Sequence, residues 1–132
     1  MTFALLVMTL NEIEGMKCVM PKIDNDWIDE LLVVDGGSTD GTVEWARKNG
    51  YRVHLQRQKG IRHGYIEALE VVKSDYVIIF SPDGNSVPEN IRPTKLHSVG
   101  LYAIQFSWTD GHDTGLYSHD LMRKLCQCVA CQ

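Results

Sequence analysis

The sequence predicts an α/β fold, with an open, mostly parallel sheet of βαβ units followed by a small C-terminal β-hairpin and helix. Two observations support this fold class. Short apolar runs alternate with segments whose apolar residues recur at helical spacing, which is typical of βαβ units with right-handed crossovers. Beyond about residue 93, two strand-like runs flank an Asp-Gly turn, which indicates a hairpin.

Four strands and three helices are expected in the first part of the chain. The expected strands are Phe3–Met8, Leu31–Val34, Arg52–Leu55 and Tyr76–Phe80. The expected helices are about Glu12–Met20, Thr42–Lys48 with its N-cap at Thr39 or Asp40, and Gly64–Val72 with Ile66, Leu69 and Val72 facing inward. The run Val77–Phe80 is apolar throughout, which predicts a strand buried on both faces of the sheet.

A module boundary is expected near Ile91–Thr94, which divides the chain into residues 1–92 and 93–132. In the second module, a helix at roughly Ser118–Leu125 is expected to follow the hairpin and to lead into the last cysteines. The length of 132 residues, with 44% hydrophobic and 23% charged, fits one globular domain with a small appendage.

The formal net charge of −4 gives no support to nucleic-acid binding, which needs a basic face. The apolar opening is interrupted by Asn11 and Glu12 too early for a transmembrane helix, and it has no basic region or cleavage site typical of a signal peptide. Cys18 stands alone, while Cys126, Cys128 and Cys131 lie close together, which is not the spacing of a secreted disulfide framework. We therefore expect a cytoplasmic protein with reduced thiols.

Polar side chains follow two of the expected strands. In an open α/β sheet, the space beyond the carboxyl ends of the strands is where ligands bind. Asp35 ends one strand and is followed by Gly36 and Gly37, where a side chain would obstruct a ligand; the alternative is a turn with a capping Asp. After Phe80 come Ser81, Pro82, Asp83, Gly84 and Asn85, which predict either a metal site or an ordinary surface turn.

The motifs in residues 2–91 resemble those of the family 2 glycosyltransferases, which have the GT-A fold and are relatives of dolichyl-phosphate mannose synthase. The first strand ends in Met8-Thr9-Leu10-Asn11-Glu12, similar to that family's P-x-Y-N-E segment. Residues 35–42 are similar to its D-D-G-S-x-D-G-T segment, with Gly36 in place of the second Asp. The resemblance implies nucleotide contacts at Thr9, Glu12, Asp35 and Gly37, and a diphosphate segment with Gly60, Arg62 and His63.

The same resemblance favours the metal interpretation of the turn after Phe80. The family's D-x-D-x-Q motif holds Mg²⁺ or Mn²⁺ on the diphosphate of the sugar nucleotide. Here Asp83 takes the second Asp position, Asn85 takes the amide position, and Ser81 replaces the first Asp. Because Mg²⁺ fills most of its shell with phosphate oxygens and water, one carboxylate and one amide can still serve, with weaker affinity.

The tail of the chain resembles the N-terminal domain of γ-butyrobetaine hydroxylase-like proteins. The similar features are Trp108, the Asp110-Gly111-His112 turn, Tyr117, a Leu-Met-Arg-Lys-Leu-Cys segment and C-x-C-x-x-C. The resemblance implies a structural Zn²⁺ on Cys126, Cys128 and Cys131, with the fourth ligand among His112, His119, His97 and Cys18. Three reduced thiols without metal are the alternative.

Together these features predict a glycosyltransferase-like protein that binds a nucleotide diphosphate sugar and a divalent metal for sugar transfer. No residue matches the family's catalytic base, so we expect the chain to be incomplete for catalysis alone. The alternatives are a non-catalytic nucleotide-binding module, a zinc-stabilised interaction module that binds a protein partner or a second copy, and a truncated or fused product with little activity. His54 is expected to be a partly exposed edge histidine, and Glu67 and Glu70 to be a solvated helix face.

Overall fold

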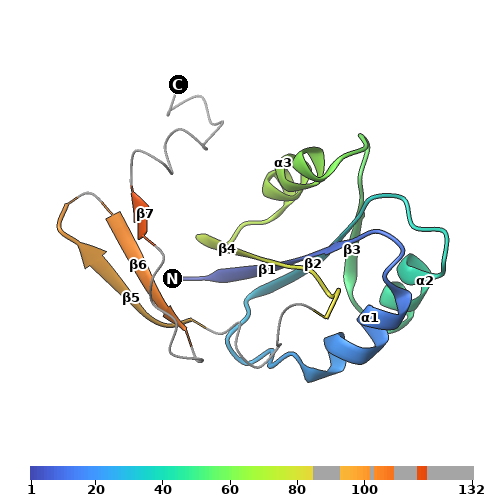
Figure 1. The fold of residues 1–132 in the computed structure, drawn as a ribbon, viewed down its shortest axis with the longest axis horizontal. Coiled ribbons are helices and arrows are strands. Elements are labelled where there is room, and N and C mark those ends of the chain that lie inside the picture. The colour runs from blue at the N-terminus through green and yellow to red at the C-terminus, as the bar shows by residue number, and fades with distance from the viewer. Residues whose placement is uncertain (85–92, 102, 109–115, 119–132) are drawn as a thin grey trace. The chain divides into compact units, whose positions relative to one another are not determined.

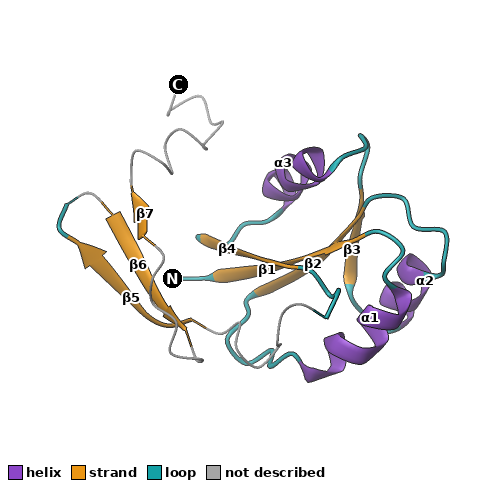
Figure 2. Cartoon of the chain, viewed as in Figure 1, coloured by secondary structure: helices purple, strands orange, loops and turns teal. Residues whose placement is uncertain are grey.

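A computed structural model describes residues 1–84, 93–101, 103–108 and 116–118 of the chain (Figure 1). The chain divides into two compact units, Met1–Glu89 and Asn90–Gln132. Unit 1 combines a sheet with helices, whereas the described part of unit 2 consists of strands (Figure 2). No helix in these described ranges is long and apolar enough to span a membrane.

Unit 1 contains a four-stranded sheet in the order β3-β2-β1-β4. Its strands are β1 (Phe3–Thr9), β2 (Glu30–Asp35), β3 (Arg52–Leu55) and β4 (Tyr76–Phe80). All neighbouring strands are parallel. The α/β class predicted from the alternating pattern is therefore confirmed, and each expected strand lies within two residues of its predicted bounds.

The helices of unit 1 lie on both faces of this sheet, as Figure 1 shows. They are α1 (Ile13–Val19), which continues into a 3₁₀ turn at Met20–Lys22, α2 (Thr42–Lys48) and α3 (Ile61–Val71). The chain moves outward from β1 to β2 to β3 and then returns past β1 to β4. Right-handed crossovers place helices on opposite faces when the direction of winding reverses, so α1 and α2 cover one face and α3 covers the other.

The core consists of one apolar layer on each face of β1 and β2. Toward α3 the layer contains Leu6, Met8, Leu32, Val34 and Ala68, with Tyr65, Val71, Val72 and Val77 packed against it. Alternate residues of β1 and β2 face the other way, where α1 and α2 contribute buried side chains; these are Leu5, Val7, Val33, Met16, Val19, Val43 and Ala46. Because both faces are covered, β1 and β2 are continuous apolar runs.

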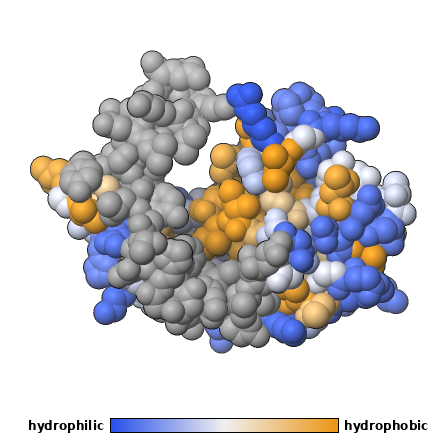
Figure 3. Space-filling model, viewed as in Figure 1, coloured by the Kyte–Doolittle hydropathy of each residue, from blue (hydrophilic) through white to orange (hydrophobic). Residues whose placement is uncertain are grey.

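Strand β4 differs from the prediction of a strand buried on both faces. It lies at one edge of the described sheet, and Ile79 is 51% exposed. Helix α3 packs over β1 and β2, so it leaves the end of β4 uncovered on that face. Figure 3 shows apolar residues gathered over the sheet on this side of unit 1. An apolar run therefore indicated a strand correctly, but not its place within the sheet.

Two helical details also differ from the predictions. Helix α3 buries Gly64, Glu67 and Ala68, while Leu69, which was expected to face inward, is 57% exposed. The N-cap of α2 is Gly41, which has a left-handed φ of 96°. Asp40 still contributes, because its carboxylate accepts hydrogen bonds from the N–H and the hydroxyl of Thr42.

The described part of unit 2 is a three-stranded antiparallel sheet in the order β5-β6-β7. Its strands are β5 (Pro93–Val99), β6 (Ala103–Trp108) and β7 (Leu116–Ser118). Strands β6 and β7 pair antiparallel, as expected for the predicted hairpin, whereas β5 was not predicted. Ser118, the expected start of a helix, ends β7, and residues 119–125 lie outside the described residues.

Candidate functional site

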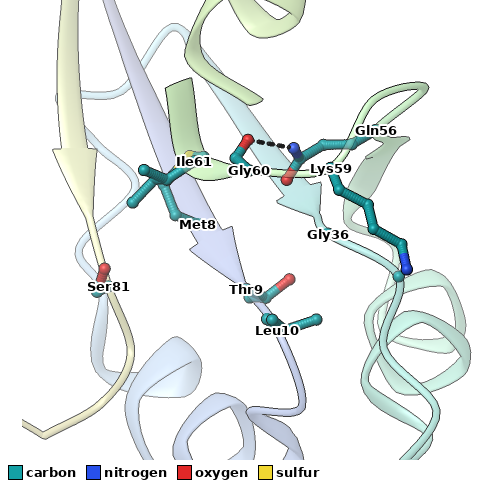
Figure 4. Close-up of a pocket in the computed structure, with 10 residues that line it drawn as sticks. Met8, Thr9, Leu10, Gly36, Gln56, Lys59, Gly60, Ile61 and Ser81 are labelled. Carbon is teal, nitrogen blue, oxygen red and sulfur yellow. Dashed lines mark hydrogen bonds between the residues drawn. The ribbon is translucent and has the colours of Figure 1, made fainter. Parts of the chain in front are cut away.

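A cavity of about 440 Å³ lies in unit 1 at the carboxyl ends of the parallel strands. Each of the four strands, or the loop that follows it, contributes to its wall (Figure 4). The lining residues are Met8, Thr9, Leu10, Gly36, Gly37, Gln56, Lys59, Gly60, Ile61 and Ser81. This is the edge of the sheet at which the sequence predicted a ligand site. Thr9, Gly37 and Gly60 are the predicted site residues among the lining.

Asp35 lies beneath this cavity and is fully buried. Its Oδ1 accepts the N–H groups of Gly37 (2.9 Å) and Ser38 (2.7 Å), and its Oδ2 accepts the hydroxyls of Thr9 (2.8 Å) and Ser38 (2.6 Å). Burial by itself raises the pKa of Asp35, but the hydrogen bonds from Ser38, Thr9 and Gly37 outweigh it, so the pKa lies below its ordinary value. The carboxylate therefore organises the turn between β2 and α2, which is one of the two roles that the sequence left open.

The loops after β1 and β2 are joined side by side. Asn11, with a left-handed φ of 54°, accepts the N–H of Thr39 on its side-chain oxygen (2.8 Å), and its own N–H donates to the hydroxyl of Ser38 (2.7 Å). The N–H of Glu12 donates to the hydroxyl of Thr42 (3.1 Å). Glu12 is thus fixed at the start of α1, half-buried, and is not among the residues that line the cavity.

The opposite wall of the cavity is the loop between β3 and α3, and Glu67 anchors it. The Glu67 carboxylate, only 4% exposed, accepts the N–H groups of Arg57 (2.9 Å) and Gln58 (3.1 Å) and the Nε2–H of His54 (2.7 Å). The N–H of Arg57, followed by the ring of His54, lowers the pKa of Glu67 to about 2. The expectation that Glu67 lies on a solvated helix face is therefore wrong, because the loop folds over it and satisfies its oxygens.

Gln56 lies at the start of that loop. Its main-chain N–H donates to the carbonyl of Asp35 (2.9 Å), and its side-chain Nε2 donates to the carbonyls of Gln58 (3.0 Å) and Gly60 (2.9 Å). Figure 4 shows the bond to Gly60 and the adjacent Lys59. Sequence reasoning missed Gln56 and Lys59, although Gln56 directly follows a strand, which is the same signal that pointed to Asp35.

The remaining predicted site residues are not among those that line the cavity. Arg62 is exposed and His63 half-buried on the first turn of α3, next to the lining residue Ile61. Asp83 is exposed two residues beyond the lining residue Ser81. Helix α1 packs closely against this turn, because a Cβ atom at Gly15 would overlap the carbonyl oxygen of Pro82. Asn85, Cys126, Cys128 and Cys131 lie outside the described residues.

Within the described ranges, no three His, Cys, Asp or Glu side chains are grouped as a metal site would require. The donor groups described near the predicted metal position are the carboxylate of Asp83 and the hydroxyl of Ser81. One carboxylate is compatible with a divalent ion that is held mainly by diphosphate oxygens and water. It is not compatible with a metal site built from protein side chains alone.

Residues 1–84 have the α/β fold seen in glycosyltransferase structures. Crystal structures of glucosyl-3-phosphoglycerate synthase from Mycobacterium tuberculosis match with a TM-score of 0.55 and 29% identity over 66% of this chain and 36% of the synthase. Those structures include complexes with UDP, Mn²⁺ and UDP-glucose. A structure described only as a mycobacterial protein matches with a TM-score of 0.57, 25% identity and 66% coverage of this chain and 33% of that chain.

Among curated proteins, the glycosyltransferase AglJ from Haloferax volcanii is 36% identical over 81 residues, which are 61% of this chain and 27% of AglJ. The chain thus spans about a third of the length of these relatives. It belongs to the family described as "Gamma-butyrobetaine hydroxylase-like, N-terminal", whose model matches residues 35–123. That range begins at Asp35, well before the tail to which we assigned this resemblance, and it ends before Cys126.

Proposed function

We propose that this chain binds a nucleotide diphosphate sugar, and a uridine nucleotide in particular, as the nucleotide-binding part of a glycosyltransferase. The observation that carries the proposal is the cavity at the carboxyl ends of the four parallel strands. Its position at this edge fits the general location of ligands in open α/β sheets. The likeness to AglJ and to a synthase whose structures hold UDP supports the choice of ligand.

The lining of the cavity suits such a ligand. Leu10 and Ile61 are 58% and 60% exposed, so they offer apolar surface on which a base can pack. Gly36 and Gly37 carry no side chains, which allows a ligand to approach the main chain closely. Lys59 adds a positive charge to the lining, and Arg62 adds another on the neighbouring turn of α3, where a diphosphate would need compensation.

We further propose that Asp83 holds Mn²⁺ or Mg²⁺ against the diphosphate, with Asn85 as a second ligand. Such an ion neutralises the negative charge that develops on a departing diphosphate. The residues of this chain would then bind the nucleotide, orient its sugar and hold the ion. Asp35 and Glu12 support the nucleotide from beneath, through the turns that they fix. Transfer to an acceptor is proposed to require groups that the described residues do not provide.

The test is a calorimetric titration of UDP with and without Mn²⁺. Mn²⁺ should strengthen binding, and Asp83→Ala should abolish that gain while leaving metal-free binding in place. Ser81→Asp should increase the gain, because a second carboxylate adds a negative charge beside the ion. Asp26→Ala is the matched control, since Asp26 is an exposed carboxylate before β2, at the opposite edge of the sheet. Absence of UDP binding in both conditions would contradict the proposed function.

A further inference from the structure

We propose that the side-chain carbonyl of Gln56 is the base-reading group of the cavity and that it selects uracil over cytosine by accepting the N3–H of the ring. This inference rests on the proposed function, since it names the nucleobase that the same cavity takes. It begins from the few polar side chains that line the cavity, which are Thr9, Gln56, Lys59 and Ser81. Only the amide of Gln56 offers a carbonyl oxygen.

The amide of Gln56 is held in one orientation. Both acceptors of its Nε2 are main-chain carbonyls, those of Gln58 at 3.0 Å and Gly60 at 2.9 Å. A flip of the amide would direct Oε1 at these two carbonyl oxygens, where no hydrogen is available. Oε1 is therefore fixed on the side away from these two carbonyls, and it has no hydrogen-bond donor among the residues that the structure describes.

Two glycines lie beside this oxygen, and neither brings a side chain against it. A Cβ atom at Gly36 would lie 3.2 Å from Oε1 of Gln56, and a Cβ atom at Gly64 of α3 would lie 3.0 Å from it. Glycine brings no side-chain acceptor to position 36. Asp35 offers none to a ligand, because its two oxygens already accept four hydrogen bonds within the protein. Among the described side chains, the Gln56 carbonyl is therefore the acceptor that this side of the cavity presents.

A fixed acceptor distinguishes pyrimidines at ring position 3. Uracil carries an N–H there, which can donate to Oε1, whereas cytosine carries an unprotonated nitrogen whose lone pair would face the oxygen. A site that hydrogen-bonds one ligand rejects an analogue that lacks the donor, since a polar group is then left without a partner. The amide cannot adapt to cytosine by flipping, for the reason given above. Discrimination thus follows from the two bonds that hold Nε2.

The experiment compares UDP, CDP and N3-methyl-UDP by calorimetry with the wild-type chain in the presence of Mn²⁺. UDP should bind about tenfold more tightly than either analogue. N3-methyl-UDP keeps the ribose and diphosphate but replaces the donor with a methyl group, whereas CDP lacks the donor without added bulk at N3, so the two analogues together report the contact at the base. Equal affinities for UDP and N3-methyl-UDP would overturn this inference and leave nucleotide binding intact. Failure of all three to bind would overturn the proposed function, and this inference with it.

Variants test whether the preference for UDP comes from Gln56. Gly36→Ala keeps the bonds from Gln56 Nε2 but adds a methyl group 3.2 Å from Oε1, so close that one of the two must shift by a few tenths of an ångström, and it should reduce the tenfold ratio to about one. Gln56→Met should do the same, with its melting temperature recorded because it also removes the bonds from Nε2. Gln58→Ala is the matched control: Gln58 is exposed and contributes only main-chain groups, so the ratio should persist. A ratio that persists in Gly36→Ala and Gln56→Met would contradict the assignment.

Discussion

The two loops that face each other across the cavity are both held by a buried carboxylate, but in different ways. Asp35 holds its own loop, since the N–H groups that it accepts belong to Gly37 and Ser38, two and three residues further on. Glu67 holds a loop from a distance, since it lies on α3 and accepts N–H groups nine and ten residues earlier, at Gln58 and Arg57. Asp35 therefore stabilises a local turn, whereas Glu67 joins a helix to the loop that precedes it.

The difference shows why the sequence identified Asp35, and not Glu67, as a candidate site residue. An Asp at the end of a strand, followed by Gly-Gly-Ser, is a local pattern that predicts a turn or a ligand site. A Glu in the middle of an amphipathic helix has the same local appearance whether it faces solvent or a folded loop. Its burial depends on where the loop lies, which is a property of the tertiary structure.

The largest effect is expected from Asp35→Ala. The substitution leaves the donors at Thr9, Gly37 and Ser38 without their acceptor in a buried position, so we expect a loss of about 2–4 kcal/mol in the free energy of unfolding. Urea denaturation measures it, with Glu44→Ala, an exposed carboxylate on α2, as the control. A change as small as that of the control would mean that the turn holds without Asp35.

Glu67→Gln is expected to have a smaller effect on stability and a clearer one on binding. All the described partners of the Glu67 carboxylate are hydrogen-bond donors, and the NH₂ group of a neutral amide cannot accept their hydrogen bonds. The β3–α3 loop should therefore loosen, so that UDP binds more weakly and Tm falls by about 3–6 °C. Glu70→Gln is the matched control, because Glu70 is exposed on the same helix and, among the residues that the structure describes, pairs with the Arg57 side chain alone. Equal effects of the two substitutions would contradict an anchoring role for Glu67.

The smallest effect is the pH dependence that Glu67 contributes. Its pKa in the folded chain is lowered from 4.5 to about 2, so its contribution to stability is fully present above about pH 4.5 and is lost as the pH falls toward 2. The difference in unfolding free energy between wild type and Glu67→Gln should therefore shrink over that range. Urea denaturation at a series of pH values measures it, and a difference that stays constant down to pH 2 would exclude this ionisation as the cause.

The sequence predicted the sheet well because its signals are local. The strand from Arg52 to Leu55 and the helix from Thr42 to Lys48 were predicted with their observed bounds. The predicted inward face of α3 was wrong at Leu69, which is exposed, whereas Val72 packs against the core as expected. The burial of Glu67 depends on the hydrogen bonds that the loop supplies. The exposure of Ile79 depends likewise on strand order, which periodicity does not contain.

The candidate site was predicted in location more completely than in composition. The rule that ligands lie beyond the carboxyl ends of strands pointed to the edge of the sheet where the cavity lies, and Thr9, Gly37 and Gly60 are among its lining residues. Their nucleotide contacts stay a prediction. Gln56 and Lys59 were not predicted as site residues, because glutamine and lysine are common in exposed loops. Their place in the lining follows from the way the loop folds, which the hydrogen bonds to Glu67 stabilise.

The order of strands in the sheet also affects how the chain folds during its synthesis. Strand β1 lies between β2 and β4, with Ala4 opposite both Glu30 and Val77. During synthesis β2 follows β1 soon, but β4 emerges only after two further helices and another strand. At about 5–20 residues per second, one edge of an apolar strand stays unpaired for a few seconds, long enough to pair with a wrong partner. The nascent chain is therefore most exposed to misfolding and to chaperone binding in the interval before Tyr76–Phe80 is available.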